Sequence, residues 1–409
     1  MEWKDYIAPM YEGEELIKRL AVHTEYNESI RSASVAERLM ALSSLYDMYI
    51  PTDMSVEIYY KLYLALVHSL SRKRTSNSNT QLYENYKAIK GSPYHGILGG
   101  IDSFVITGGS GIGKSSAISR AISVISADNI IEIKSPYQKI IPFLVVQTPF
   151  DCSLKSLLLE ILRKVDEVLG TKYLFNSLRT RATTDILIGT VSTAAMNHIG
   201  ILVLDEIQNV ANSKNGKNLV GSIVQLINSS GIAIVFAGTA SIVPFIQADF
   251  MLARRLMNLH YNPLPYNQKF YSLCKIIFMF QFTKEKSELT EEITSLLYKF
   301  SQGNISVIIS LIVEAQESAI QCGQEAISIE TIQSAYKKRL RLLDGFRSSQ
   351  DKRYDVPSKE TFFLPICNDP NNESEHLFSD IVVRSKAMKV GILELLRQYN
   401  IAVEEVDIG

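Results

Sequence analysis

One short stretch, residues 108–115, constrains the fold of this chain more than any other feature. It reads GGSGIGKS, follows the apolar run 104–106, and precedes a segment, 116–125, with the pattern of a helix. A glycine-rich turn between a strand and a helix is typical of a P-loop, which binds phosphate groups at a helix N-terminus. We therefore predict that the chain binds a nucleotide.

The parts of this loop have different roles. The glycines leave backbone N–H groups free to surround phosphate oxygens, the ammonium of Lys114 reaches the β and γ phosphates, and the hydroxyl of Ser115 binds Mg²⁺. The residues predicted to bind the nucleotide are those of this stretch and the next one, namely Gly108, Gly109, Ser110, Gly111, Ile112, Gly113, Lys114, Ser115 and Ser116.

Composition and charge place the chain in a broad class. It has 409 residues, 46% hydrophobic and 21% charged, with a net charge of −1. These values are typical of a soluble globular protein and exclude a globally basic nucleic-acid coat, while allowing local basic patches. The cysteines lack CxxC spacing, which indicates neither zinc nor a disulfide framework. Without an apolar signal core or a membrane-spanning run, the chain is expected to be cytoplasmic, with no membrane partner.

The pattern of apolar residues divides the chain into four regions. Between residues 98 and 266, short apolar runs alternate with helical patterns, which indicates an α/β domain with a parallel sheet covered by helices on both faces. Residues 1–97 and 267–343 have helical patterns, and residues 344–409 form a C-terminal extension containing prolines. The five expected strands are Phe104–Thr107, Phe143–Gln147, Ile201–Leu204, Ile232–Ala237 and Leu259–Tyr261.

A second motif makes the first more specific. The apolar run 201–204 ends in Asp205 and Glu206, which is the pattern of a Walker B motif. Asp205 is expected to hold hydrated Mg²⁺, and Glu206 to orient and polarise the attacking water. The alternative, a solvated pair of acids, leaves charge at the tip of a core strand, which is unfavourable. We predict that Glu206 and Lys114 are catalytic and that Asp205 and Ser115 bind the metal.

Two further candidates follow later in the chain. The hydroxyl of Thr239, after the run 232–237, is placed to contact the γ-phosphate or the attacking water; alternatively, Thr239 caps a helix that begins near Ser241. Arg254 and Arg255 precede the fifth expected strand. An arginine there suits a finger that stabilises transition-state charge in a neighbouring subunit, although paired arginines are also common on solvated surfaces. We predict catalytic roles for Thr239 and one of these arginines.

Together these motifs resemble those of the AAA+ ATPases. LDE at 204–206, FAGT at 236–239 and ARRL at 253–256 follow the P-loop in that order and precede a helical region that resembles the AAA+ lid. Within this family the chain resembles the transposition regulators of the TnsC/TniB type, with MuB and IstB as more distant relatives. The segment 46–51 and the helix after it are similar to the entry region of TnsC proteins.

The resemblance implies an ATPase that binds ATP and Mg²⁺ at subunit interfaces in a prokaryotic cytoplasm. Such proteins form rings or helical filaments on duplex DNA through head-to-tail contacts, and recruit a transposase to a site chosen by a target-selection protein. ATP hydrolysis then releases the assembly. The family's lid often supplies an arginine from a GxxR element, but the matching stretch here, 303–306, has Ser306 in that place.

The resemblance also suggests contacts with DNA and with the base. Family members contact the DNA backbone around the second strand, where this chain has Lys134, Lys139, Thr148 and Lys155. Phosphate contacts carry no base readout, and lysines near strand ends are also commonly just solvated. His95 lies upstream of the first strand, where AAA+ proteins commonly surround the base of the nucleotide. Alternatively, His95 is an ordinary loop residue.

Three alternatives remain open from the sequence. A helicase loader would favour single-stranded DNA, whereas an origin-recognition-like initiator would carry a winged-helix domain after its lid, for which residues 344–409 look short. A signalling P-loop ATPase of a defence system would show no ATP-dependent assembly on DNA. The extension 344–409 is expected to bind a partner such as the transposase, or to fold back on its own ATPase core.

Overall fold

The computed structural model describes residues 6–74, 102–134, 137–148, 153–211, 226, 230, 232–247, 250–254 and 256–340. The chain divides into two compact units, Met1–Ser349 and Gln350–Gly409, and the described residues all belong to the first. The extension predicted at 344–409 therefore lies outside them. None of the described helices is long and apolar enough to cross a bilayer.

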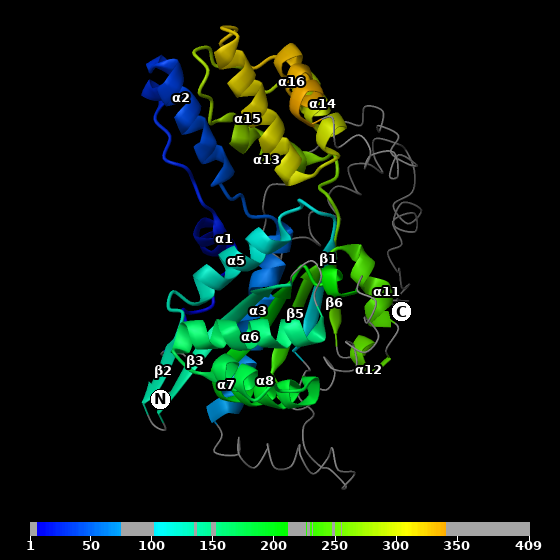
Figure 1. Ribbon diagram of the computed structural model, residues 1–409. Helices are drawn as coiled ribbons and strands as arrows, with labels where there is room; N and C mark the ends of the chain where they lie inside the picture. Colours follow the sequence, from blue (N-terminus) through cyan, green and yellow to red (C-terminus); the bar gives the residue numbers. More distant parts are fainter. Residues whose placement is uncertain are drawn as a thin grey trace, which may run out of the picture. The chain divides into compact units, whose positions relative to one another are not determined.

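A six-stranded sheet organises the first unit (Figure 1), in the order β2-β3-β4-β5-β1-β6. All neighbouring strands run parallel except β2, which is antiparallel to β3. The predicted α/β fold with five parallel strands is confirmed. The strands are β1 (Phe104–Gly108), β2 (Ile131–Lys134), β3 (Tyr137–Gln147), β4 (Ile199–Asp205), β5 (Ala233–Gly238) and β6 (Met257–Tyr261).

β2 is the strand that was not predicted from the sequence pattern. β2 is short and pairs with the first residues of β3, from Ile131 opposite Ile140 to Lys134 opposite Tyr137. Because β3 begins at Tyr137, it is longer than the predicted strand at 143–147. The alternating pattern of β2 is too short to predict a strand by itself. The strand forms because β2 pairs with β3 in a hairpin.

Helices cover both faces of the sheet because successive strand residues point to opposite sides. In β1, Val105 packs into one core, whereas Phe104 and Ile106 pack into the other. The first core contains α6 (Leu154–Leu169), α7 (Tyr173–Arg179) and α8 (Thr184–His198), and the second contains α1 (Gly13–Leu20), α3 (Asp53–Arg74) and α5 (Lys114–Ile125).

A third core belongs to the helical lid and includes part of the N-terminal segment. Leu42, Leu45 and Met48 pack there, although α1 and α3 on either side belong to the sheet core. The lid elements are η2 (Glu28–Ser32), α2 (Val35–Leu42), η3 (Ser43–Tyr46), α13 (Gln268–Phe278), α14 (Glu291–Ser301), α15 (Ile305–Gln321), α16 (Ile329–Ala335) and the π-helical turn η5 (Tyr336–Leu340). The N-terminal segment thus contributes to two cores; the boundaries 1–97, 98–266 and 267–343 remain predictions.

A partly buried ion pair joins the N-terminal segment to the lid. Arg38 has no exposed surface, and its two terminal nitrogens donate to the carboxylate of Glu325 at 2.6 and 2.8 Å. One of them also donates to the Phe282 carbonyl at 3.1 Å. Nearby, the hydroxyl of Tyr26 donates to the Gln281 carbonyl at 2.7 Å. These contacts fix α2 and the segment before it on the lid.

Replacing Arg38 by methionine is expected to destabilise the lid by about 3 kcal/mol, because it leaves Glu325 without its main partner. Hydrogen bonds from Arg38 lower the pKa of Glu325 to about 2. The ion pair therefore contributes its full stabilisation of the folded protein above the ordinary carboxyl pKa of about 4.3, and this contribution is lost as the pH falls toward 2. Thermal unfolding followed by circular dichroism should show this acid-induced loss in the wild type and not in Arg38→Met.

The matched control is Arg163→Met. Arg163 forms an exposed ion pair with Glu160 at 2.7 Å, and its loss should cost less than about 1 kcal/mol. An Arg38→Met protein with the wild-type acid dependence would show that this ion pair does not stabilise the lid.

Candidate functional site

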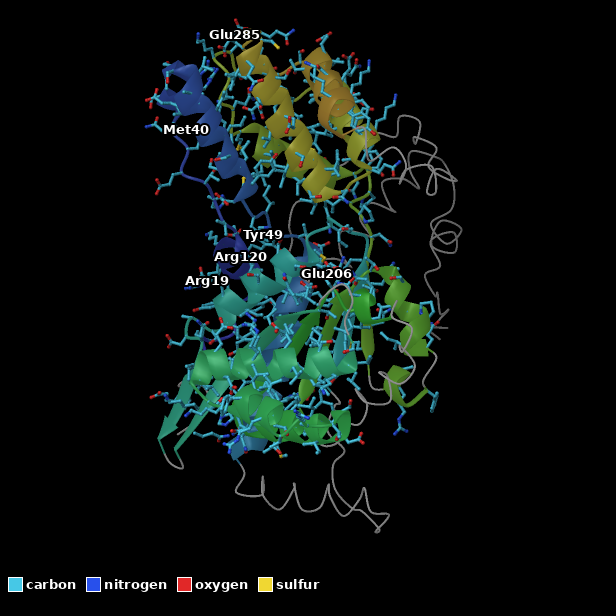
Figure 2. The ribbon with its side chains drawn as sticks, viewed as in Figure 1. Arg19, Met40, Tyr49, Arg120, Glu206 and Glu285 are labelled. Atoms are coloured by element: carbon cyan, nitrogen blue, oxygen red, sulfur yellow. The ribbon has the colours of Figure 1, made fainter. Side chains whose placement is uncertain are left out.

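The predicted nucleotide residues meet at one edge of the sheet. Thr107 of β1 lies opposite Gly238 of β5, and Gln147 of β3 lies opposite Asp205 of β4. Because these strands are parallel, the segments that follow them gather at their shared carboxyl edge, where open α/β sheets bind ligands. Glu206 is labelled at this edge in Figure 2.

The P-loop has the backbone that its glycines allow. Gly111 and Gly113 have φ of +79° and +96°, a left-handed conformation that favours glycine. Lys114 begins α5, is only 9% exposed, and donates from Nζ to the carbonyls of Gly108 at 3.0 Å and Gly109 at 2.8 Å. Burial lowers the pKa of Lys114, and the nearby charges of Glu206 and Asp205 oppose this shift. The ammonium is therefore held at the loop, beside two carboxylates.

Ser115 and Asp205 are the residues predicted to bind Mg²⁺. Ser115 and Ser116 are exposed in the first turn of α5. Asp205 is 6% exposed at the end of β4, and its Oδ1 accepts from the Glu206 N–H at 2.9 Å. No group of three or more acidic, histidine or cysteine residues in the described part could hold a metal. One hydroxyl and one carboxylate fit Mg²⁺, which keeps several waters and takes few protein ligands.

Glu206 lies in a polar turn that is tied to both neighbouring strands. Its φ is +55°, a left-handed conformation that a side chain with Cβ rarely adopts. Nε2 of Gln208 donates to its carboxylate, and Oε1 of Gln208 accepts from the Thr239 N–H at 3.2 Å. Asn209, in the short helix α9 (Gln208–Ala211), donates to the Thr148 carbonyl at 2.8 Å. Neither Gln208 nor Asn209 was predicted from the sequence; their signal is their position two and three residues after Glu206.

Thr239 lies beside this turn, at the end of β5. It occupies the N-cap position of η4 (Ala240–Ile242), but its side chain makes no capping hydrogen bond. Its hydroxyl lies 2.7 Å from the hydroxyl of Ser241. Thr239 therefore stands at the cap position predicted by one interpretation without the capping side-chain hydrogen bond, and the phosphate contact remains a prediction.

The arginine pair is only partly described. Arg254 is exposed, directly after α12 (Phe250–Ala253), which follows α11 (Val243–Gln247). Its backbone N–H donates to the Phe250 carbonyl at 3.1 Å. Arg255 and His95 lie outside the described residues. An exposed Arg254 is compatible with a contact to another subunit, and the finger remains a prediction.

The four candidate DNA contacts do not form one patch. Lys134 and Lys139 belong to the β2–β3 hairpin, and Nζ of Lys139 lies 3.2 Å from the Glu132 carboxylate. Thr148 and the exposed Lys155 lie near the other end of β3, about 30 Å away at the usual rise per strand residue. Thr148 is 3% exposed, and its hydroxyl has no partner among the described residues. A contact between Thr148 and DNA would require this strand end to open.

The lid contacts the P-loop through the stretch predicted to match GxxR. Nδ2 of Asn304 donates to the Ser110 carbonyl at 2.7 Å, and the Ser306 N–H donates to the Gly111 carbonyl at 3.2 Å. A Cβ on Gly111 would lie 2.5 Å from the Ser306 hydroxyl oxygen. The lid thus reaches the loop through neutral groups in the place where the resemblance leads us to expect an arginine.

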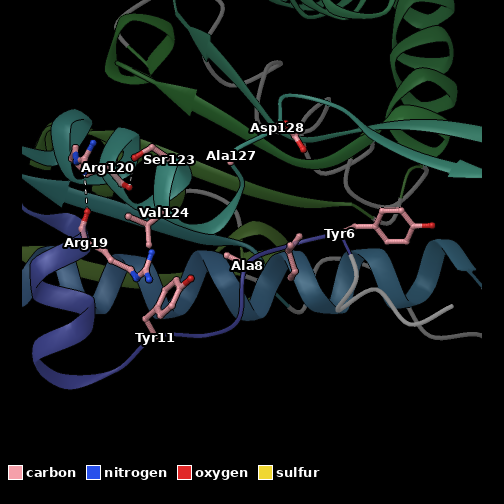
Figure 3. Close-up of a pocket in the computed structure, with 10 residues that line it drawn as sticks. Tyr6, Ala8, Tyr11, Arg19, Arg120, Ser123, Val124, Ala127 and Asp128 are labelled. Atoms are coloured by element: carbon pink, nitrogen blue, oxygen red, sulfur yellow. Dashed lines mark hydrogen bonds between the residues drawn. The ribbon is translucent and has the colours of Figure 1, made fainter.

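A separate cavity of about 620 Å³ lies between the N-terminal segment and α5 (Figure 3) and contains none of the predicted nucleotide residues. Arg120 lines it and donates to the carbonyls of Leu20 and Arg19, both at 2.9 Å. The guanidinium of Arg19 lies 3.9 Å from the centre of the Tyr11 ring. Arg120 therefore fixes the N-terminal segment against α5, whereas the contact between Arg19 and Tyr11 lies within that segment.

Asn304→Ser should increase the dissociation rate of ATP about fivefold. Serine keeps the N-cap of α15 but is too short to reach the Ser110 carbonyl, and one such hydrogen bond contributes about 1 kcal/mol. Stopped-flow release of a fluorescent ATP analogue measures the rate. Asn267→Ser is the matched control, since Asn267 caps α13 away from the loop. Equal rates for both variants would contradict a role of the lid contact in nucleotide retention.

The comparisons with known proteins identify the domain that carries this site. Residues 99–265 match the family model of the bacterial TniB protein. A search of curated protein sequences gave no significant match. The matched range contains the P-loop, Asp205 and Glu206, so the resemblance to AAA+ regulators of the TniB type is confirmed. Residues 99–265 form an AAA+ ATPase domain, and the protein is an ATPase that binds nucleotide.

Several solved structures show similarity at low sequence identity. The Aeropyrum pernix ORC1 protein in complex with DNA is 16% identical, with 81% of this chain and 79% of that chain covered and a TM-score of 0.43. Drosophila ORC bound to DNA is 11% identical, with coverages of 83% and 80% and a TM-score of 0.40. Thermotoga maritima RuvB is 11% identical, with coverages of 80% and 82% and a TM-score of 0.34. These scores are too low to indicate a shared function.

Proposed function

Since residues 99–265 are a TniB-type AAA+ domain, we propose that this protein is an ATP-dependent regulator of DNA transposition. It assembles on duplex target DNA, recruits and activates the transposase, and uses ATP hydrolysis to control disassembly. The observation that carries the proposal is the family match across the P-loop, Asp205 and Glu206. A bacterial cytoplasmic location follows from the same family and also remains a proposal.

The nucleotide chemistry is assigned to residues at the carboxyl edge of the sheet. The P-loop backbone and Lys114 bind the phosphates of ATP, while Ser115 and Asp205 hold Mg²⁺. Glu206 orients and polarises the attacking water, because its carboxylate is exposed beside the metal ligand. Thr239, at the end of the neighbouring strand, is proposed to contact the γ-phosphate or that water.

Assembly follows from a site shared between subunits. An exposed Arg254, with Arg255 next to it in the sequence, is proposed to reach the nucleotide of a neighbouring copy and stabilise transition-state charge. A head-to-tail interface of this kind closes into a ring or continues as a helix. ATP then joins the subunits, and its hydrolysis weakens the interface.

The proposed partners are duplex DNA, the transposase and a target-selection protein. DNA is bound through its phosphate backbone, with Lys134, Lys139 and Lys155 as candidate contacts, so binding is independent of base sequence and sensitive to salt. The extension 344–409 is the proposed docking segment for a protein partner. The family relation supports these roles and does not assign residues to them.

Glu206→Gln tests the function directly. The variant should bind ATP but hydrolyse it at least about a hundredfold more slowly, because the attacking water loses its base. Electron micrographs with ATP and duplex DNA should therefore show rings or filaments that persist longer than those of the wild type. Lys114→Ala is the control, since it should lose ATP binding and assembly together.

The same micrographs, repeated with single-stranded DNA, separate two of the alternatives from the proposed function. Assembly on single strands alone would indicate a helicase loader, and a protein that stays monomeric with ATP and duplex DNA would indicate a signalling ATPase. Normal turnover in Glu206→Gln would contradict the role of Glu206. Formation of ATP-dependent assemblies on duplex DNA is the result expected here.

Charge neutralisation tests the DNA contacts. Lys134→Gln with Lys139→Gln should reduce the slope of log K against log salt by about two, and Lys155→Gln by about one, since each lost phosphate contact removes about 0.9 from the slope. Fluorescence anisotropy with a labelled duplex measures binding. Lys18→Gln, an exposed change in α1, is the control. Unchanged slopes in both variants would place the DNA site elsewhere on the protein.

A further inference from the structure

The side-chain amide of Gln208 is fixed at both of its ends. Its Nε2 donates to the carboxylate of Glu206, and its Oε1 accepts from the backbone N–H of Thr239 at 3.2 Å. The side chain is half-buried, whereas Glu206 is exposed. A single amide thus joins the turn after β4 to the end of β5.

The chemistry of the two partners determines the orientation of this amide. A backbone N–H is only a donor, so it must face the oxygen of Gln208, which leaves the NH₂ group to face a carboxylate that only accepts. The space around the amide oxygen of Gln208 is also limited. A Cβ on Gly238 would lie 2.5 Å from the same oxygen, so the glycine at the end of β5 allows the amide to approach.

Glu206 needs such a restraint. Its backbone has a φ of +55°, a conformation that costs free energy for a residue with Cβ and persists where surrounding contacts hold it. The Ile207 N–H donates to the Ala237 carbonyl at 3.1 Å, which holds the turn against β5. Among the side-chain hydrogen bonds of the described residues, the one from Gln208 is the contact that restrains the carboxylate of Glu206.

We propose that Gln208 is a positioning residue for ATP hydrolysis, which holds the carboxylate of Glu206 in a fixed relation to the end of β5 and Thr239. The inference rests on the proposed role of Glu206 as the group that orients the attacking water. Positioning of this kind acts on the chemical step, since misplacement of a catalytic group slows the reaction without removing contacts to the bound nucleotide.

Two substitutions separate positioning from a merely structural role. Gln208→Met keeps the length of the side chain and removes both hydrogen bonds. Gln208→Glu keeps the acceptor for Thr239 but places a carboxylate against Glu206. If Gln208 positions Glu206, both variants should lower kcat about tenfold or more and change KM less than about twofold. If the amide serves only to accept from Thr239, Gln208→Glu keeps the wild-type kcat, and the proposal is overturned.

Steady-state hydrolysis of radiolabelled ATP gives kcat and KM, and calorimetry gives the ATP affinity. Gln321→Met is the matched control, because Gln321 also donates to a glutamate, Glu317, at 3.0 Å, on the exposed surface of α15. This control should have wild-type kcat and KM. Loss of ATP affinity equal to the loss of kcat in Gln208→Met would indicate a disrupted site and would also overturn the proposal.

A double variant tests the coupling. In a Glu206→Gln background, Gln208→Met should lower the residual rate less than about twofold, because its effect depends on the carboxylate. A full additional tenfold loss would show that Gln208 acts independently of Glu206. Assembly on duplex DNA is a separate readout. If the protein hydrolyses ATP but never assembles on DNA, and the Gln208 variants lose kcat, the transposition proposal fails and the positioning role stands.

Discussion

The parallel register of β3, β4, β5 and β1 is the constraint on which the nucleotide site depends. Asp205, Gly238 and the P-loop are distant in sequence, and they meet because each ends a strand at the same edge. Strand residues alternate between faces, so a one-residue slip of β4 would exchange the two faces of its side chains. The buried apolar side chains on both faces of the sheet therefore fix the register of the strands, and the register sets the position of the polar groups at the edge.

The N-terminal segment connects this edge to the lid. Near the start of α3, Asp53 forms an ion pair with Lys269 of the lid, and Glu57 accepts from the Tyr261 hydroxyl at 2.8 Å. The methyl group of Met54 would lie 3.8 Å from a Cβ on Gly113. Within a few residues, α3 thus contacts the lid, the sheet and the P-loop. A displacement of the lid against the sheet has to change these contacts.

Much of the sheet, and the position of the candidate site at its carboxyl edge, could be predicted from the sequence, because both are encoded locally. Continuous apolar runs specify buried parallel strands, and the glycines, Lys114 and the two carboxylates have fixed positions within their motifs. The contact between Asn304 and Ser110 is different, since 194 residues separate the two. The periodicity of apolar residues predicts which face of a helix or strand is buried, but not which other element that face contacts. Thr148 illustrates the same limit. Its position after a strand could be predicted from the sequence, but its burial beside Asp205 depends on strand register.

The neutral lid contact has a consequence for how hydrolysis is controlled. Charge develops on the phosphate oxygens in the transition state, and cations placed near them stabilise it. The P-loop supplies Lys114, while the lid presents Asn304 and the backbone of Ser306 to the loop. If the second cation comes from Arg254 or Arg255 of a neighbouring copy, a single chain is an incomplete catalyst. Under the proposed function, hydrolysis then depends on assembly, so that each copy keeps its ATP until its neighbours are in place.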